Sequence, residues 1–509
     1  MQPRRRPLVA LALAAALGLA LVVPGSAATA VAAPEAPFLS VGVERGAITI
    51  ARVDAVCCTV YRVFRAVGSG PETEVAHDVT MPWTDTDLTP GVRYSYRARA
   101  VFGGVQSDFS APAPTVMALA PADGHDGEFT PIDPFRALDT RIGLGAPVGP
   151  VGPGGVVSFD PRLTDALPGD GVSAVLLNVT GTESTQPTHV RVWPTGEPLP
   201  DTSSLNLVPG TSRPNQVVVP LGADGTVSLH NNAGFTQLIA DVQGFYSTAD
   251  GVDGVGYYAG PSLRLFDTRL PERGLQHAAD GDSPLGEGPL GPFTEVWIPL
   301  YALMSVPVTA VEVNVTATEP TQPGHLVAWP GQSPAPGVSN VNFVPGQTVP
   351  NRAVVPVTFN AMGWPGIALK NNSGGRTHVI IDLQGFYDDG SLPAGLRYRP
   401  TDTRRIADTR VGNHPLAPGQ TLVVPRPTEQ EEAAVAHVVN VTATQSTGPG
   451  HLIGWSGDGV VPGTSVVNFA RGEDSPNLAT VTAGADGRIA VTGGSSTVHV
   501  VVDHLGYFY

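Results

Sequence analysis

Residues 177–180 read Leu-Asn-Val-Thr, and this stretch decides the fold because its Asn-Val-Thr triplet occurs three times, at Asn178, Asn314 and Asn440. Each triplet is followed by a Trp after 15 residues and by further Asn residues after 28 and 37. Fixed internal spacing indicates copies of one structural unit. The residues at these positions are Trp193, Trp329 and Trp455; Asn206, Asn342 and Asn468; and Asn215, Asn351 and Asn477.

Two further motifs frame each copy. Asp-Thr-Arg lies upstream, and an Asp followed by Gly and an aromatic residue lies downstream. We therefore predict three homologous repeats, at 131–248, 257–388 and 397–509. The upstream Asp and Arg are Asp139 and Arg141, Asp267 and Arg269, and Asp408 and Arg410; the downstream Asp residues are Asp241, Asp382 and Asp503.

The composition favours strands and turns. The chain of 509 residues holds 60 Gly and 50 Pro, and only 15% of its residues are charged. Within one repeat, short apolar stretches separated by turn signals predict about eight strands. Eight short antiparallel strands in about 115 residues indicate a β-sandwich or a jelly-roll-like barrel. The predicted fold class is therefore all-β, with one immunoglobulin-like sandwich ahead of three such repeats.

The N-terminal residues 1–33 are typical of a secretory signal peptide. Arg4, Arg5 and Arg6 precede an apolar run from Leu8 to Val23, and small residues that suit cleavage follow. The alternative is a retained anchor helix, but the apolar run is short for a membrane span. We therefore expect a secreted protein that is outside the membrane in its mature form. Cys57 and Cys58 are adjacent, which leaves either two free thiols or a strained disulfide.

Residues 34–120 predict a separate domain, followed by a linker at 121–130. Residues 88–96 read Leu-Thr-Pro-Gly-Val-Arg-Tyr-Ser-Tyr, which resembles the signature of fibronectin type III domains. That resemblance implies that Leu88 packs inward and that Tyr94 forms a tyrosine corner. The sequence departs from the family at residues 48–50, which read Ile-Thr-Ile where a core Trp is usual.

The repeats resemble a module found in tandem in secreted proteins of high-GC Gram-positive bacteria. The matching text is Leu-Asp-Thr-Arg at 138–141, Leu-Asn-Val-Thr at 177–180, Ser-Asn-Val-Asn-Phe at 339–343, and Val-Asp leading to Gly-Tyr-Phe at 502–508. The resemblance implies a fold and an extracellular location, and it implies no particular activity.

The charge of the chain limits its partners. The formal net charge is −16, which argues against nucleic acid and anionic membranes. We expect a polysaccharide or a cell-wall surface as partner, and the oligomeric state stays open. We expect no cofactor and no metal, because the acid-rich linkers at 123–128 and 250–253 lack the ligand spacing of a calcium loop.

The Asp-Thr-Arg motifs have a structural and a functional interpretation. A short Asp accepts backbone N–H bonds in a turn, and an Arg paired with it would lock two loops. Three matched Asp and Arg could also hold a ligand. The downstream Asp241, Asp382 and Asp503 lie in apolar strands and need a partner there. The Arg of the upstream motif is the predicted partner, which favours the structural role.

Two other recurring residue types are candidates for ligand binding. His189, His325 and His451 stand 11 residues after each triplet, without an acid at metal-ligand spacing, so a structural role is favoured. Each recurring Trp is either a sugar-stacking platform or part of the core. The Asn residues at 28 and 37 are predicted to form turns through their own backbone.

No catalytic motif is present in the sequence. It contains neither His-Glu-x-x-His nor Gly-x-Ser-x-Gly, and no phosphate loop or dinucleotide fingerprint. We therefore expect a non-catalytic binding or spacer protein associated with glycan or the cell envelope. Two alternatives stay open: an accessory protein of polysaccharide degradation, and a weak hydrolase at the repeat interfaces, which would need two carboxylates facing each other in a cleft.

Overall fold

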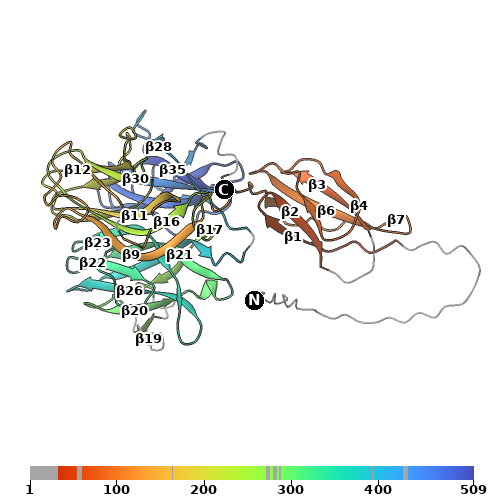
Figure 1. The fold of residues 1–509 in the computed structure, drawn as a ribbon, viewed down its shortest axis with the longest axis horizontal. Coiled ribbons are helices and arrows are strands. Elements are labelled where there is room, and N and C mark those ends of the chain that lie inside the picture. Colours follow the sequence, from red (N-terminus) through yellow and green to blue (C-terminus); the bar gives the residue numbers. More distant parts are fainter. Residues whose placement is uncertain are drawn as a thin grey trace, which may run out of the picture.

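The computed structural model describes residues 33–53, 60–162, 164–270, 276–278, 284–285, 288–392, 394–427 and 434–509. The predicted signal segment from Leu8 to Val23 and the two cysteines lie outside these ranges. The described chain is all-β, and its one helical element is the short 3₁₀ helix η1 (Tyr301–Leu303). A small N-terminal domain stands beside a larger body made of the three repeats (Figure 1).

The N-terminal domain is a fibronectin type III-like sandwich. One sheet has the order β1-β2-β5, and the other has β4-β3-β6-β7 with β8 paired to β6. The hydroxyl of Tyr94 accepts the backbone N–H of Thr89 at 2.9 Å, which is the tyrosine corner that the sequence implies. Ile48 and Ile50 are fully buried in this core, in the stretch that lacks the usual Trp. The strands are β1 (Leu39–Glu44), β2 (Ala47–Arg52), β3 (Val60–Val67), β4 (Thr73–Val79), β5 (Trp83–Asp85), β6 (Arg93–Phe102), β7 (Val105–Gln106) and β8 (Val116–Met117).

Repeat 1 contains the eight strands that its sequence predicts. Its inner sheet has the order β14-β11-β16-β9 and its outer sheet has β10-β15-β12-β13. Numbered along the repeat, these orders are 6-3-8-1 and 2-7-4-5, which is the arrangement of a jelly roll. The strands are β9 (Phe129–Asp139), β10 (Val156–Phe159), β11 (Val172–Thr182), β12 (Thr188–Pro194), β13 (Leu205–Leu207), β14 (Arg213–Pro220), β15 (Val227–Asn231) and β16 (Gln237–Ser247).

Repeats 2 and 3 have the same topology. Their inner sheets have the orders β17-β27-β21-β24 and β28-β35-β30-β33. The outer sheet of repeat 2 is extended by β18, β19 and β25. Repeat 2 contains β17 (Tyr257–Asp267), β18 (Gln276–Ala278), β19 (Pro284–Leu285), β20 (Glu295–Pro299), β21 (Val308–Thr318), β22 (Gly324–Trp329), β23 (Val341–Phe343), β24 (Thr348–Pro356), β25 (Thr358–Phe359), β26 (Pro365–Ser373) and β27 (His378–Asp388). Repeat 3 contains β28 (Tyr398–Asp408), β29 (Thr421–Val424), β30 (Ala436–Thr444), β31 (Gly450–Trp455), β32 (Val467–Phe469), β33 (Ser475–Thr482), β34 (Ile489–Gly493) and β35 (His499–Phe508).

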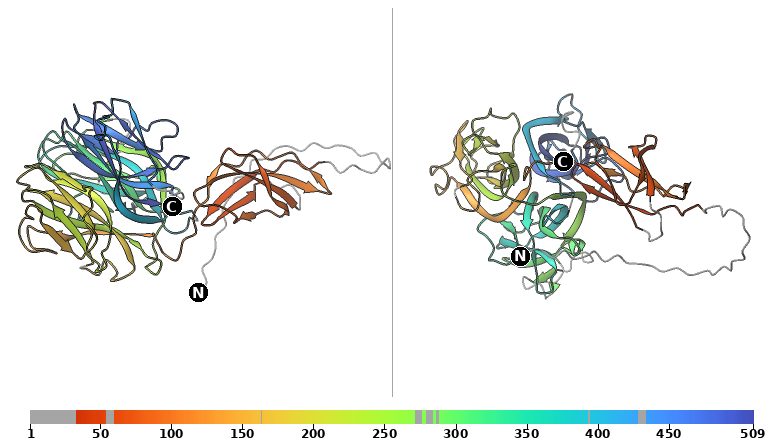
Figure 2. Two further views of the ribbon diagram at one scale, coloured as in Figure 1. Left: turned by 90° about the horizontal axis from the view of Figure 1, so that it is seen from above. Right: turned by 45° about the vertical axis from the view of Figure 1, so that its right-hand side comes forward.

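The three repeats close into a ring around a pseudo-threefold axis. In Figure 2 they form three lobes about a common centre. The inner edge strands β14, β24 and β33 contact one another pairwise at that centre. The core of repeat 1 continues across the centre into residues of the other two repeats, such as Tyr387 and Phe508. The repeats are therefore parts of one packed body, not modules on flexible linkers.

The recurring Asn residues join neighbouring repeats in this ring. Between repeats 1 and 2, Asn351 Nδ2 donates to Asn178 Oδ1 at 2.8 Å, and Asn351 Oδ1 accepts the backbone N–H of Gln216 at 3.2 Å. Asn178 Nδ2 donates to the carbonyl of Ser339 at 2.5 Å. The same three bonds recur between repeats 2 and 3 and between repeats 3 and 1, through Asn477 with Asn314 and Asn215 with Asn440.

The prediction that the Asn residues at 28 and 37 form turns is therefore wrong. The Asn residues at 28 are the central residues of β13, β23 and β32. Asn215, Asn351 and Asn477 lie within strands and are 0–1% exposed. A buried amide must have partners for both of its polar ends, and here a neighbouring repeat supplies most of them. The Asn of the triplet and the Asn at 37 residues thus bind each other across the repeat interfaces and close the ring.

Six aromatic rings fill one end of the axis. Each repeat supplies the first residue of its first strand and an aromatic residue near the end of its last strand. Adjacent ring centroids lie 4.2–6.3 Å apart, and the hydroxyl groups of Tyr246 and Tyr387 are 3.0 Å apart. The Gly of the downstream motif makes room for them, since a Cβ on Gly385 would lie 2.1 Å from the Tyr257 hydroxyl. The six are Phe129, Tyr246, Tyr257, Tyr387, Tyr398 and Phe508.

A buried ion pair lies near the same axis and is not repeated. Arg352 and Glu312 are both 0% exposed, and Arg352 Nη2 donates to Glu312 Oε2 at 2.5 Å. Arg352 also donates to Gln216 of repeat 1 and to Thr480 of repeat 3. Burial opposes the charge on Arg352, but Glu312 raises its pKa above the ordinary value. One side chain of repeat 2 therefore binds both other repeats in the low-dielectric centre.

Arg45 and a few apolar residues, Val43, Leu119 and Ala120, hold the fibronectin-like domain against the ring. Arg45 donates to the carbonyls of Gly395 at 2.8 Å and Tyr509 at 3.0 Å, and its guanidinium lies 5.2 Å from the Tyr509 ring centroid. Burial lowers the pKa of Arg45 to about 10. The linker that follows is also packed, because Gly127 N donates to Ser247 O and Gly127 O accepts from Tyr398 N. The linker at 123–128 is therefore anchored through its backbone to repeats 1 and 3.

Candidate functional site

The Asp-Thr-Arg motif forms an ion-paired corner in each repeat. In repeat 1, Arg141 Nε donates to Asp139 Oδ1 at 2.9 Å and Nη2 donates to Asp139 Oδ2 at 2.7 Å. The backbone N–H of Arg141 also bonds to Asp139. Burial opposes ionisation of Asp139, but these bonds hold its pKa below the ordinary value. The Arg269–Asp267 and Arg410–Asp408 pairs repeat this geometry.

The downstream Asp pairs with a different arginine from the one predicted. Asp241 is bound by Arg136, whose Nε lies 2.9 Å from Asp241 Oδ1 and whose Nη1 lies 3.1 Å from Asp139 Oδ2. Arg264 and Arg405 bridge the equivalent carboxylates in repeats 2 and 3. Arg136 reaches Asp241 because β9 and β16 pair these two residues directly.

The sequence carries a signal for these arginines that the prediction missed. The full motif is Arg-x-x-Asp-Thr-Arg, with Arg136, Arg264 and Arg405 three residues before each Asp. The second Arg instead closes the local turn, because its side chain folds back on an Asp two residues away. Burial raises the pKa of Asp241 to about 6, although Arg136 acts to lower it. Burial likewise raises the pKa values of Asp382 and Asp503.

Two of the recurring histidines, His189 and His325, lie near arginines that bind the corner carboxylates of a neighbouring repeat. His189 of repeat 1 lines a cavity of about 250 Å³ together with Arg405 and Arg410 of repeat 3. Its Nε2 accepts from Arg191 Nε at 3.3 Å, and burial with Arg191 lowers its pKa. His325 bonds to Asn372, and burial with Arg136 of repeat 1 lowers its pKa. Burial also lowers the pKa of His451. Two motifs that are distant in sequence therefore meet across repeat interfaces.

The recurring tryptophans occupy equivalent strands, β12, β22 and β31, but they differ in exposure. Trp193 is 9% exposed and Trp329 is 3% exposed, and each indole N–H donates to a carbonyl four residues on. The Trp329 ring is too buried for a sugar to stack on it, so the sugar-platform hypothesis fails there, whereas Trp193 keeps a small exposed area that lines a cavity. Trp455 is half-buried, and its N–H donates to Thr492 Oγ1 at 3.0 Å.

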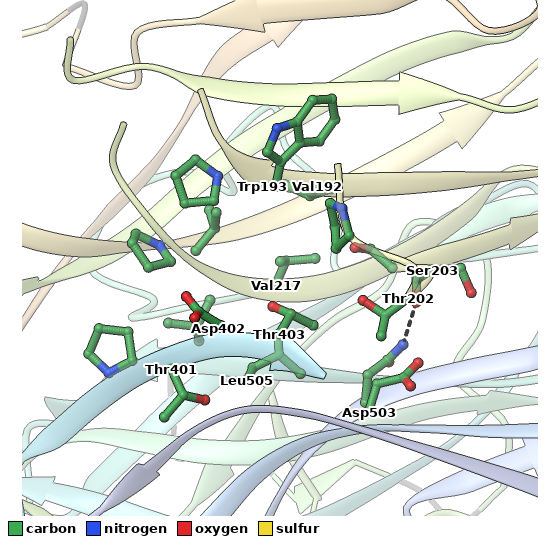
Figure 3. Close-up of a pocket in the computed structure, with 18 of the residues that line it drawn as sticks. Val192, Trp193, Thr202, Ser203, Val217, Thr401, Asp402, Thr403, Asp503 and Leu505 are labelled. Atoms are coloured by element: carbon green, nitrogen blue, oxygen red, sulfur yellow. Dashed lines mark hydrogen bonds between the residues drawn. The ribbon is translucent and has the colours of Figure 1, made fainter. Parts of the chain in front are cut away.

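A cavity with a volume of about 540 Å³ lies between repeats 1 and 3. Figure 3 shows its two sides, with Trp193 and Val192 on repeat 1 facing Thr401, Asp402 and Thr403 on repeat 3. Val217 and Leu505 give it an apolar floor, and several prolines line its walls. Drug-sized ligand sites have volumes of roughly 300–1,000 Å³ and a similar mix of apolar walls and few polar groups. We call this cavity the 1/3 cleft.

The charged cavity of His189 continues the 1/3 cleft. The two cavities share Asp201, Ser203 and Asp503. The hydroxyl oxygen of Thr442, which lines the charged part, is buried and has no hydrogen-bond partner. An extended ligand could therefore place one end on apolar walls and the other among carboxylates, guanidinium groups and hydroxyls.

Carboxylates line the 1/3 cleft from both repeats. Asp201 of repeat 1 and Asp402 of repeat 3 are both exposed there. Asp503 is buried and bound through both oxygens by Arg405, at 2.9 and 3.3 Å. Arg405 occupies both oxygens of Asp503, so the described lining carboxylates that are exposed to a ligand are Glu197, Asp201 and Asp402. This arrangement suits hydrogen bonding to hydroxyl groups.

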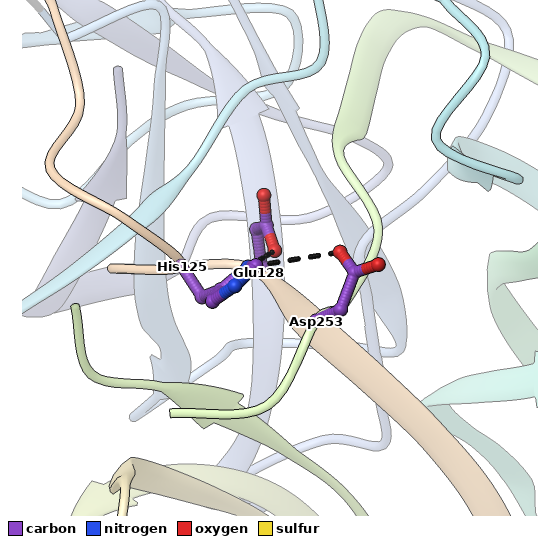
Figure 4. A group of neighbouring side chains, drawn as sticks. All are labelled: His125, Glu128 and Asp253. Atoms are coloured by element: carbon purple, nitrogen blue, oxygen red, sulfur yellow. Dashed lines mark hydrogen bonds and ion pairs between the residues drawn. The ribbon is translucent and has the colours of Figure 1, made fainter. Parts of the chain in front are cut away.

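Three side chains of the two acid-rich linkers meet near repeat 1. Figure 4 shows His125 and Glu128 beside Asp253, and His125 Nδ1 lies 2.8 Å from Glu128 Oε2 and 3.6 Å from Asp253 Oδ1. Glu128 is already bound by Arg397 and by the backbone N–H of Gly254. A cation would compete with Arg397 for that carboxylate. The cluster therefore joins the linker to repeat 3 through the ion pair between Glu128 and Arg397.

Comparison with known proteins identifies no family. No protein-family model matches the chain, and no curated protein matches its sequence. Solved structures with some likeness include the FN1–FN3 domains of chicken CNTN1, at 12% identity and a TM-score of 0.16 over 67% of this chain and 100% of that one. Another is the tandem CBM22-1-CBM22-2 domain of Paenibacillus barcinonensis Xyn10C, at 10% identity and a TM-score of 0.17 over 52% of this chain and 100% of that one. No likeness this distant transfers a function.

The described residues include no helix with the length and apolarity needed to cross a bilayer.

Proposed function

We propose that the protein is exported and binds neutral polysaccharide, without cleaving it, in the 1/3 cleft. The observation that carries this proposal is the cleft itself, which joins an apolar floor to a rim of hydroxyls and carboxylates. Pyranose rings present apolar C–H faces and polar hydroxyl edges, so this combination suits them. The N-terminal signal pattern supports export.

A ring architecture changes how such binding would work. Three independent weak sites on short linkers would gain avidity as the number of repeats rises. In the ring, however, the 1/3 cleft needs residues of both repeat 1 and repeat 3. One repeat alone would therefore lack the site, and a three-repeat chain would carry it once.

The test compares retention of the chain from residue 34 onward on insoluble polysaccharides and cell-wall preparations. Thr403→Trp would fill the cleft from the repeat 3 side, where Thr403 is half-buried. Ser262→Trp is the matched control, since Ser262 holds the equivalent position on β17 of repeat 2. We expect wild type and Ser262→Trp to be retained and Thr403→Trp to lose about tenfold in affinity, as for one or two lost polar contacts.

Two outcomes would overturn the proposal. One is that the wild-type chain is retained on none of the preparations. The other is that Thr403→Trp is retained as well as wild type while thermal unfolding shows it to be folded. Analysis of released sugars in the same incubations distinguishes binding from hydrolysis, because a hydrolase would need two of the exposed carboxylates Glu197, Asp201 and Asp402.

A further inference from the structure

A second cavity lies between repeats 2 and 3, at the position that is equivalent to the 1/3 cleft. Its volume is about 180 Å³, and we call it the 2/3 pocket. Gly260, Pro261 and Ser262 line it where Thr401, Asp402 and Thr403 line the 1/3 cleft. The pseudo-threefold axis therefore relates the two cavities, while their side chains differ.

The floor of the 2/3 pocket carries a buried polar atom without a partner. Gln384 is 5% exposed and lines the pocket, and its Oε1 has no hydrogen-bond partner. The equivalent residue in repeat 3 is Leu505, which gives the 1/3 cleft its apolar floor. In repeat 1 it is Gln243, whose Oε1 accepts from Gln216 at 2.5 Å. A buried acceptor that stays unpaired costs roughly 1–3 kcal/mol, so a donor that enters the pocket would gain from pairing with it.

The walls of the pocket indicate what kind of donor fits. Trp455 is the most exposed of the three recurring tryptophans, and its N–H bond to Thr492 fixes the ring. Ser262, Ser456 and Thr482 add hydroxyl groups. The only charged lining residue is Asp458, whose Oδ2 accepts the N–H of Ala485 at 2.7 Å. With no cationic lining residue, the pocket does not suit an anion.

We propose that the 2/3 pocket binds a single neutral sugar residue, with its ring against Trp455 and one hydroxyl donating to Gln384 Oε1. At ~30 Å³ per water in the liquid, a cavity of this size holds about six waters, which is also space for one pyranose ring. This site does not depend on the 1/3 cleft, whose ligand is an extended chain.

The test is titration of the chain from residue 34 onward with neutral hexoses, pentoses and N-acetylhexosamines, and with a uronic acid as the charged probe. Saturation-transfer NMR reports the bound sugar. Gln384→Leu installs the residue that repeat 3 carries at this position, and it removes an unpaired buried polar group, so its melting temperature should equal or exceed that of wild type. We expect at least one neutral sugar to bind and Gln384→Leu to weaken it about tenfold, the loss of one hydrogen bond.

Two controls separate this site from the 1/3 cleft. Ser262→Trp should abolish monosaccharide binding, whereas Thr403→Trp should leave it unchanged. The proposal is overturned if the wild type binds none of the neutral sugars, if Gln384→Leu binds as well as wild type, or if only the uronic acid binds. Loss of polysaccharide retention alone would reject the proposed function and leave this site standing.

Discussion

Repeat 3 buries two histidines at positions where the other repeats bury aliphatic residues. His437 and His504 are 1% and 0% exposed, and His437 Nδ1 lies 3.2 Å from His504 Nε2. The outer ring nitrogens face Gly487 O and Thr401 Oγ1, each at 3.2 Å. Repeat 2 carries Val311 and Leu383 at these positions, and repeat 1 carries Val175 and Val242. We predict that this pair makes the ring labile to acid.

The magnitude follows from the two pKa values. Burial lowers the pKa of His437 to about 4, and burial together with His437 and Arg404 lowers that of His504 to about 2. Arg426 adds a further positive charge near His437. In the unfolded chain both titrate near 6.5. The unfolded state therefore takes up protons first, so stability is complete above pH 6.5 and falls by about 1.4 kcal/mol per histidine for each pH unit below it.

Between pH 6.5 and pH 4.5 the two histidines together would lower the free energy of unfolding by about 5 kcal/mol, which is comparable to the whole stability of many domains. The perturbation is the double substitution His437→Val/His504→Leu, which installs the pair that repeat 2 carries. The assay is urea unfolding at a series of pH values between 7.5 and 4.5. We expect wild type to lose about 5 kcal/mol more than the double variant over this interval.

The control is His414→Gln, because His414 is exposed and this variant removes one histidine without altering the buried pair. Other groups that titrate in this range, such as Asp241, are the same in all three proteins and cancel in the comparison. If wild type and the double variant lose equal stability between pH 6.5 and pH 4.5, the histidines are not held neutral by burial and the reasoning is refuted.

Three further predictions concern the ring and export. Asn351→Ala should reduce the free energy of unfolding, measured with urea, by about 3–5 kcal/mol, because it leaves the buried Asn178 Oδ1 and the Gln216 N–H unpaired. A loss below about 1 kcal/mol would contradict a ring-closing role for Asn351. Arg136→Met should lower the free energy of unfolding by about 3–5 kcal/mol because it removes the partner of the buried Asp241. Arg141→Met should lower it by only about 1 kcal/mol, because the Arg141 side chain is 38% exposed. Equal losses for the two variants would argue against this assignment of partners. N-terminal sequencing of protein from culture supernatant should find a start between Ala28 and Pro34, and recovery of an intact Leu8 to Val23 segment from membranes would exclude export by signal cleavage.

The strands were predictable because their signals are local. In repeat 1, the apolar run of β11 and the Asp224-Gly225 turn between β14 and β15 can be recognised within a few residues. The tyrosine corner likewise links Tyr94 to a backbone group only five residues away. Identical spacing in three copies then implied one fold for all three repeats.

The ring was not predictable because tandem repeats in a sequence are equally compatible with an open linear array of domains. Asn215 bonds to Asn440, and a single repeat gives no indication that its Asn has a partner 225 residues away. Both cavities share this property, since each is lined by two repeats. Arg136 was missed for a different reason. It lies three residues before the motif that drew attention, and its partner Asp241 becomes its neighbour only through strand pairing.

The positions that differ between repeats separate structure from specificity in this ring. The Asn bonds must be the same at all three interfaces, because a ring closes only if each rotation matches the others. At other positions the three repeats of a single chain can carry different residues, whereas three identical subunits would carry the same residue at every interface. Leu505, Gln384 and Gln243 hold one position, yet they give an apolar floor, an unpaired acceptor and a satisfied hydrogen bond. The tandem repeats thus make one rigid frame, and the interfaces are free to differ in chemistry where they meet a ligand.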